Sequence, residues 1–139
     1  MDIEIIGVEG AQADIEVLAI ASDLLNELGI AKHITLELNS LGDPESRTAY
    51  RAALVSYFSG YKNKLSEDSL KRLEKNPMRI LDSKDEGDRL LIEEAPRIAD
   101  YYNQQTRDFF AEVISGIEDI GIKYKINDRL VRGLDYYCH

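Results

Sequence analysis

Hydrophobic residues in the first third of the chain recur with two different periods, one typical of strands and one typical of helices. Residues 3–8 alternate apolar and polar side chains, which predicts a short strand that carries Glu4. Residues 13–28 place apolar side chains at helical spacing, and Gly29 is suited to end this helix in a left-handed conformation. Residues 33–39 alternate again, so a second strand follows the helix.

The middle of the chain is predicted to be helical. Asp43 can cap a helix that has Pro44 in its first turn and runs to Gly60. Ser66 caps a shorter helix, which ends at Asn76 before Pro77. Residues 82–88 are predicted to form an exposed polar connection, followed by a short helical turn at 90–94.

The last third repeats the order of helix and strand. Residues 104–120 have the spacing of an amphipathic helix, closed by Gly121, and strands are predicted at 123–126 and 130–137. The strands thus lie near both ends of the chain, with a helical insert between them. This arrangement predicts the α+β class.

Composition and charge exclude several classes of protein and of binding site. The net charge of −9 argues against a dedicated nucleic-acid binder, yet residues 45–80 hold eight basic and four acidic side chains. The sequence has no apolar run long enough to span a bilayer and no secretory signal, so we expect a cytoplasmic protein without a membrane segment. One cysteine and two histidines show no zinc spacing, so no metal site is predicted.

The most informative pattern lies at residues 130–137. Arg132 precedes Gly133, which permits close approach of a ligand to the backbone, and Asp135 and the adjacent Tyr136 and Tyr137 follow. Taken by composition alone, this stretch is also compatible with an edge strand that carries a surface arginine and amphipathic aromatic residues.

Arg-Gly-Leu-Asp-Tyr-Tyr is similar to the histidine-binding signature of the histidyl-tRNA synthetases. Further segments resemble the same family in the same order, and together they span nearly the whole chain; they are Gly7 with residues 14–16, residues 37–42 with 47–51, and residues 76–84. The resemblance implies part of a class II antiparallel sheet in residues 1–44 and 104–139, the partial catalytic core. Residues 45–103 then form a helical insertion domain.

The resemblance also implies roles for individual residues. Glu4 and Tyr137 match the pair that binds the imidazole of histidine, and Tyr136 matches a second pocket tyrosine. A carboxylate and a hydroxyl together satisfy the donor and the acceptor of a neutral imidazole. Arg132 matches the catalytic arginine placed against the α-phosphate of ATP and the histidine carboxylate. ATP is then a substrate, with Mg²⁺ expected for the whole enzyme and no cofactor bound by this chain alone.

The basic region coincides with the start of the family's insertion domain, which is thought to approach the acceptor end of tRNA. A solvated helical face with ordinary lysines is the alternative interpretation. The candidate tRNA contacts are Arg47, Arg51, Lys62, Lys64, Lys71, Arg72 and Lys75.

Several parts of the family pattern have no counterpart in the chain, namely the class II dimer motif, the motif 2 and motif 3 arginines and the anticodon-binding domain. We therefore expect an interior fragment that begins just after motif 2 and is inactive alone, from a parent ligase that is a homodimer and uses histidine, ATP and tRNA(His). The fragment is expected to be a monomer or a strand-exchanged dimer. The alternatives are a synthetase-like regulator, such as the regulatory subunit of ATP phosphoribosyltransferase, and a non-catalytic tRNA-binding module.

Overall fold

The computed structural model describes residue 3 and residues 5–131, and the described chain forms two compact units. Of the described residues, unit 1 comprises 3, 5–38 and 104–126, and unit 2 comprises 39–103 and 127–131. None of the described helices is long and apolar enough to cross a membrane. The mixture of helices with a small sheet agrees with the predicted α+β class.

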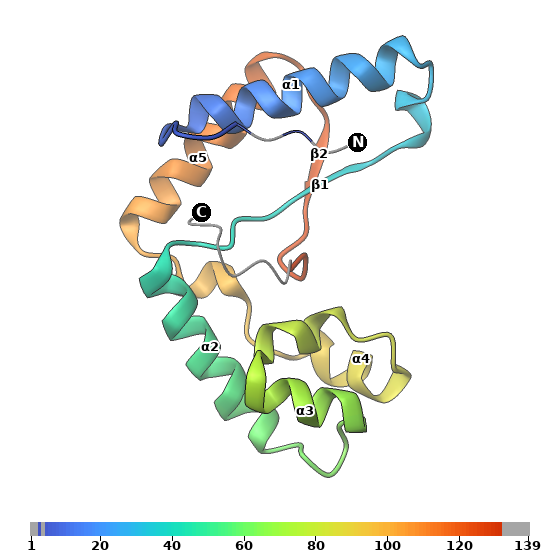
Figure 1. Ribbon diagram of the computed structural model, residues 1–139, viewed down its shortest axis with the longest axis vertical. Helices are drawn as coiled ribbons and strands as arrows, with labels where there is room; N and C mark the ends of the chain where they lie inside the picture. Colours follow the sequence, from blue (N-terminus) through green and yellow to red (C-terminus); the bar gives the residue numbers. More distant parts are fainter. Residues whose placement is uncertain (1–2, 4, 132–139) are drawn as a thin grey trace. The chain divides into compact units, whose positions relative to one another are not determined.

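Unit 1 consists of two helix-to-strand segments. The first is α1 (Ala11–Glu27), the 3-10 helix η1 (Ala31–His33) and β1 (Leu36–Leu38); the second is α5 (Gln104–Asp119) and β2 (Tyr124–Ile126). Helix α1 packs against α5, and β1 pairs with β2 (Figure 1). Both helices were predicted to within two residues at each end.

The two helices of unit 1 end in the predicted way. Gly29 and Gly121 have φ angles of +70° and +76°, the left-handed conformation that glycine adopts without a steric penalty. Behind each glycine the backbone N–H of the next isoleucine donates to a carbonyl of the last helical turn: Ile30 to Leu25 at 3.1 Å and Ile122 to Ile117 at 2.9 Å. The two similar tripeptides, Leu28-Gly29-Ile30 and Ile120-Gly121-Ile122, therefore form the same turn.

The pairing of the strands differs from the family-based expectation. β1 and β2 are parallel, with Leu36 opposite Tyr124 and Leu38 opposite Ile126, whereas an antiparallel sheet was expected. Each strand leaves its helix through the same glycine turn, and the two helices pack together, so the strands run in the same direction. Parallel strands need a long crossover, and residues 39–123 provide it.

Two other predicted strands are not found among the described residues. Residues 5–10 form no strand, and Ile5, Ile6 and Val8 are exposed. Neither of the two described strands pairs with this segment. Leu130 and Val131 are likewise not in a strand, and residues 132–137 lie outside the described part of the chain.

Unit 2 is helical and contains most of the buried side chains. Its elements are α2 (Pro44–Ser59), α3 (Glu67–Lys75), α4 (Glu86–Glu93) and the 3-10 helices η2 (Pro77–Asp82) and η3 (Ile98–Tyr101). One face of α2 lies in the core, where Tyr50, Leu54 and Phe58 are fully buried. Helix α2 packs against η2 and η3, and α3 packs against η2.

Helix α4 corrects the prediction for residues 82–94. It begins at Glu86 within the expected polar connection, and its Asp88, expected to be exposed, is fully buried. Asp85 caps it, because its carboxylate accepts a hydrogen bond from the Asp88 backbone N–H at 3.1 Å. The polar composition of residues 82–88 reflects a helix cap and a buried hydrogen-bond network, and not an exposed loop.

Candidate nucleic-acid interface

The predicted histidine and ATP contacts lie outside the described residues; they are Glu4, Arg132, Tyr136 and Tyr137. All seven predicted tRNA contacts are described, and they belong to unit 2. The candidate site that the structure presents is therefore the basic surface of α2, α3 and the turn between them.

Three of the seven basic residues line one hollow of about 390 Å³. Arg47 and Arg51 are one helical turn apart on α2, and Lys75 is the last residue of α3. The remaining lining residues are uncharged: Pro44, Thr48, Asn76 and Met78. We call this hollow the basic groove.

The basic groove is held by its own residues. The Arg51 Nη2 donates to the Lys75 carbonyl at 3.2 Å, which ties α2 to the end of α3. This bond also satisfies one of the carbonyls that a helix leaves open at its C-terminus. Asp43 caps α2 by accepting from the Ser46 backbone N–H at 2.8 Å, so the turn of α2 that carries Arg47 is fixed as well.

The other four predicted contacts lie outside the basic groove. The Lys71 ammonium is 3.7 Å from the Asp68 carboxylate in an exposed pair, and the Arg72 Nη1 donates to the Arg79 carbonyl at 2.9 Å. The Lys64 ammonium lies 5.8 Å from the centre of the Tyr61 ring, and Lys62 is exposed. The structure thus brings together Arg47, Arg51 and Lys75 but not the complete set.

A buried carboxylate joins three segments of unit 2. Asp88 accepts hydrogen bonds from the Ser66 N–H and hydroxyl at 2.9 and 2.7 Å, and from the hydroxyls of Ser69 and Ser83, both at 2.6 Å. Burial by itself raises the pKa of the Asp88 carboxyl, but these hydrogen bonds outweigh it, so the pKa is lowered. The sequence analysis missed this network, although Asp85 and Asp88 have the spacing of a helix cap.

A second group of side chains anchors the segment that leads into Arg132. The Asn39 Nδ2 donates to the Leu130 carbonyl at 3.0 Å. The Arg129 Nη2 donates to the Glu93 carbonyl at 2.7 Å, and the Asp128 carboxylate is 3.2 Å from the Arg97 Nη1. Residues 128–130 are thereby fixed to the rest of unit 2, and they end two residues before the predicted catalytic arginine.

Asn39 is itself oriented by its neighbours. The Tyr102 hydroxyl donates to the Ser40 carbonyl at 2.6 Å and lies 3.3 Å from the Asn39 Oδ1. Burial raises the pKa of Tyr102, so this hydroxyl stays protonated and available as a donor. Asn39 is the last residue of the predicted strand 33–39, and its local sequence pattern indicates no partner at Leu130.

Comparison with known proteins supports the resemblance over the whole chain, although no protein-family model matches. Histidine–tRNA ligase of Rhodospirillum rubrum is 58% identical over 137 residues, which are 99% of this chain and 33% of that protein. The same enzyme of Wolbachia pipientis is 52% identical over 139 residues, 100% of this chain and 34% of that protein. The crystal structure of apo Staphylococcus aureus histidyl-tRNA synthetase matches with a TM-score of 0.72 and 37% identity, over 96% of this chain and 31% of that chain.

The chain spans about one third of the length of these relatives. The similar proteins are named as ligases, which does not favour a synthetase-like regulator. The predicted family is confirmed: over its whole length, the chain is homologous to one third of a histidine–tRNA ligase.

Proposed function

We propose that the chain is part of a longer histidine–tRNA ligase, in which unit 2 binds the phosphate backbone of tRNA(His). The parent enzyme would join histidine to ATP as histidyl adenylate and then transfer the histidyl group to the tRNA. The observation that carries the tRNA contact is the convergence of Arg47, Arg51 and Lys75 on the basic groove. Arginine and lysine provide the charge and the donors that phosphate oxygens require.

The assignments from the family resemblance belong to this proposal. Residues 1–44 and 104–139 would form part of the catalytic core, and residues 45–103 the insertion domain. Glu4, Tyr136 and Tyr137 would bind histidine, and Arg132 would stabilise negative charge on the α-phosphate. Asn39, through Leu130, would limit the positions that Arg132 can take, which makes it a positioning residue.

The location, the oligomeric state and the metal requirement of the parent enzyme are also part of the proposal. The parent is expected to be a cytoplasmic homodimer, and its ATP is expected to carry Mg²⁺. Among residues 3 and 5–131, no cluster of three or more acidic, histidine or cysteine side chains is placed to hold a metal ion.

The chain alone is proposed to be inactive, because the family's motif 2 and motif 3 arginines have no counterpart in it. Histidine-dependent pyrophosphate exchange is the appropriate assay, with the full-length parent as the positive control. We expect exchange by the parent and none by the 139-residue chain. Exchange by the chain alone would overturn this part of the proposal.

The tRNA contact is tested by measuring the affinity of the chain for tRNA(His) at several salt concentrations. Replacing Arg47, Arg51 and Lys75 by glutamine should weaken binding at least about tenfold and reduce the slope of log affinity against log salt by about three. The matched control replaces three exposed basic residues outside the candidate set by glutamine; they are Lys84, Arg89 and Arg107. Equal losses in both triple variants, or no binding even at low salt, would contradict the basic groove as a tRNA site.

A further inference from the structure

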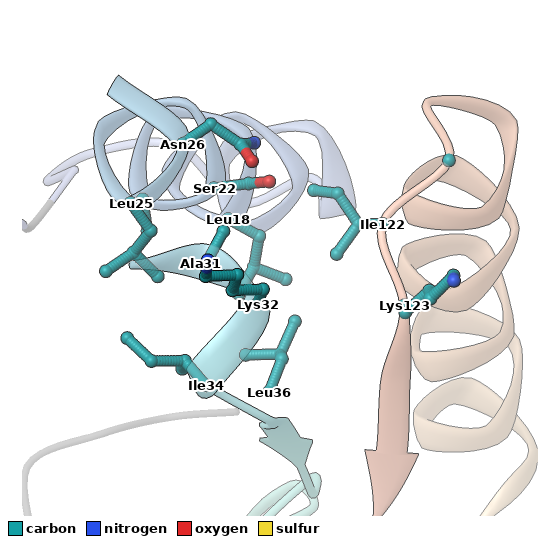
Figure 2. A pocket seen from close by; sticks show the side chains of 12 residues that line it. Leu18, Ser22, Leu25, Asn26, Ala31, Lys32, Ile34, Leu36, Ile122 and Lys123 are labelled. Carbon is teal, nitrogen blue, oxygen red and sulfur yellow. The ribbon is translucent and has the colours of Figure 1, made fainter. Parts of the chain in front are cut away.

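Unit 1 contains an apolar groove that the proposed function does not use. It has a volume of about 420 Å³ and lies between α1, η1, the start of β1 and the residues that precede β2. Figure 2 shows Leu18 and Leu25 of α1, Ile34 and Leu36 around β1, and Ile122 before β2, which together line it. Its surface is mainly hydrocarbon, which water solvates poorly.

Helix α1 is more apolar in sequence than its burial in the structure would require. Ten of its 17 residues are alanine, isoleucine, leucine or valine, yet only Ala11 is fully buried. Ile20 is 45% exposed, and Leu28, just beyond the helix, is 60% exposed. A helix with this composition normally lies in a protein interior.

Two lysines give the rim of the apolar groove a positive charge. Lys32 in η1 and Lys123 before β2 both line it and are exposed, and no described acidic residue is among its lining residues. A segment that fills the groove with apolar side chains and brings a carboxylate to these ammonium groups would match it in both respects.

We propose that this apolar groove is covered by a segment of the parent enzyme that lies outside this chain, with apolar side chains and at least one carboxylate. The inference rests on the proposed function, since it requires the longer ligase. About two thirds of the length of the similar ligases has no counterpart in the chain, so a covering segment is available. A second copy of the chain is a poorer occupant, because two chains of net charge −9 repel each other.

The first test compares the rates at which lysines react with an amine-acylating reagent in the chain and in the full-length parent, without tRNA. Lys32 and Lys123 should react at least about tenfold more slowly in the parent. Lys62 and Lys84, which are exposed in unit 2, serve as internal controls and should react at similar rates in both proteins. Equal rates for Lys32 and Lys123 in the two proteins would overturn the inference.

The isolated chain distinguishes the other possible occupants. Slow reaction of Lys32 and Lys123 that appears only at high concentration, together with a dimer in sedimentation, would show that a second copy covers the groove. Slow reaction at every concentration would show that another part of this chain covers it. Either result would overturn the inference.

The second test uses charge reversal and a functional readout. Lys32→Glu with Lys123→Glu should lower the Tm of the parent by about 2–4 °C and leave that of the isolated chain unchanged. Lys62→Glu with Lys84→Glu is the control and should change both proteins alike. Aminoacylation of tRNA(His) by the unmodified parent separates the groove inference from the proposed function. If the parent is active but charge reversal at Lys32 and Lys123 lowers the Tm of both proteins alike, only the groove inference fails. If the parent is inactive, the proposed function fails.

Discussion

At the scale of single residues, the Asp88 side chain connects three segments of unit 2. It is fully buried, and its carboxylate accepts four hydrogen bonds from three serines. Asp88→Ala would leave three hydroxyls and an N–H without this acceptor, so we expect a loss of about 3 kcal/mol in the free energy of unfolding. Urea denaturation measures it, with the exposed Asp82→Ala as the control. A loss no larger than that of the control would contradict the network's role.

The same carboxylate predicts how stability depends on pH. Its pKa in the folded chain is lowered from the usual 3.8, so the folded state favours the ionised form. The contribution of Asp88 is complete above the unfolded pKa and is lost as the pH falls through the folded pKa. The difference in unfolding free energy between the chain and Asp88→Asn should therefore shrink in this acidic range. A difference that stays constant down to the lowest pH would exclude ionisation as its origin.

Asn39 offers a test of the link between unit 2 and Arg132. Asn39→Asp keeps an acceptor for Tyr102 but removes the donor to the Leu130 carbonyl. In the full-length parent we expect kcat for pyrophosphate exchange to fall about tenfold, with little change in the KM for histidine. Asn63→Asp, at an exposed asparagine, is the matched control. A rise in KM at constant kcat would indicate a role in binding histidine instead.

These residues show why sequence analysis could propose candidate site residues in some places and not in others. The local motif at residues 132–137 and the run of basic residues are each continuous in the sequence, so both could be put forward as candidates. Asp88 is separated from Ser66 by 22 residues and Asn39 from Leu130 by 91. Such contacts depend on the tertiary fold, which local periodicity does not specify.

At the scale of the elements, helix ends were predicted best. The caps Asp43 and Ser66 and the glycines after α1 and α5 all have the expected geometry, because capping depends on a few adjacent residues. Strands were predicted less well. A strand requires a partner, and the direction of pairing between β1 and β2 follows from the packing of the helices, which the strand sequences do not encode.

The contact between α1 and α5 depends on Gly116. A Cβ atom added at this position would overlap the Ile15 side chain, so the helices approach closely only because residue 116 has no side chain. Gly116→Ala should lower the free energy of unfolding by about 1–3 kcal/mol, although alanine is the better helix former. Chemical denaturation measures this loss, and Gly116→Ala combined with Ile15→Val should recover part of it. An increase in stability on Gly116→Ala would contradict the close approach.

At the scale of the whole molecule, the two units bury very different numbers of apolar side chains. Of the 14 buried hydrophobic residues among those described, Ala11, Val113 and Ile117 belong to unit 1 and the other 11 to unit 2. The burial of apolar surface provides most of the free energy that offsets chain entropy. Unit 1 of the isolated chain should therefore be the less stable of the two.

This difference can be observed by amide hydrogen exchange on the isolated chain. Amides of α2 near Leu54, which is fully buried, should exchange at least about tenfold more slowly than amides of α1 between Leu18 and Leu25, which are only partly buried. In the full-length parent, α1 should become slow as well, because the apolar groove would be covered. Exchange of α1 as slow as that of α2 in the isolated chain would mean that unit 1 needs no further partner, and both the stability order and the covering segment would have to be abandoned.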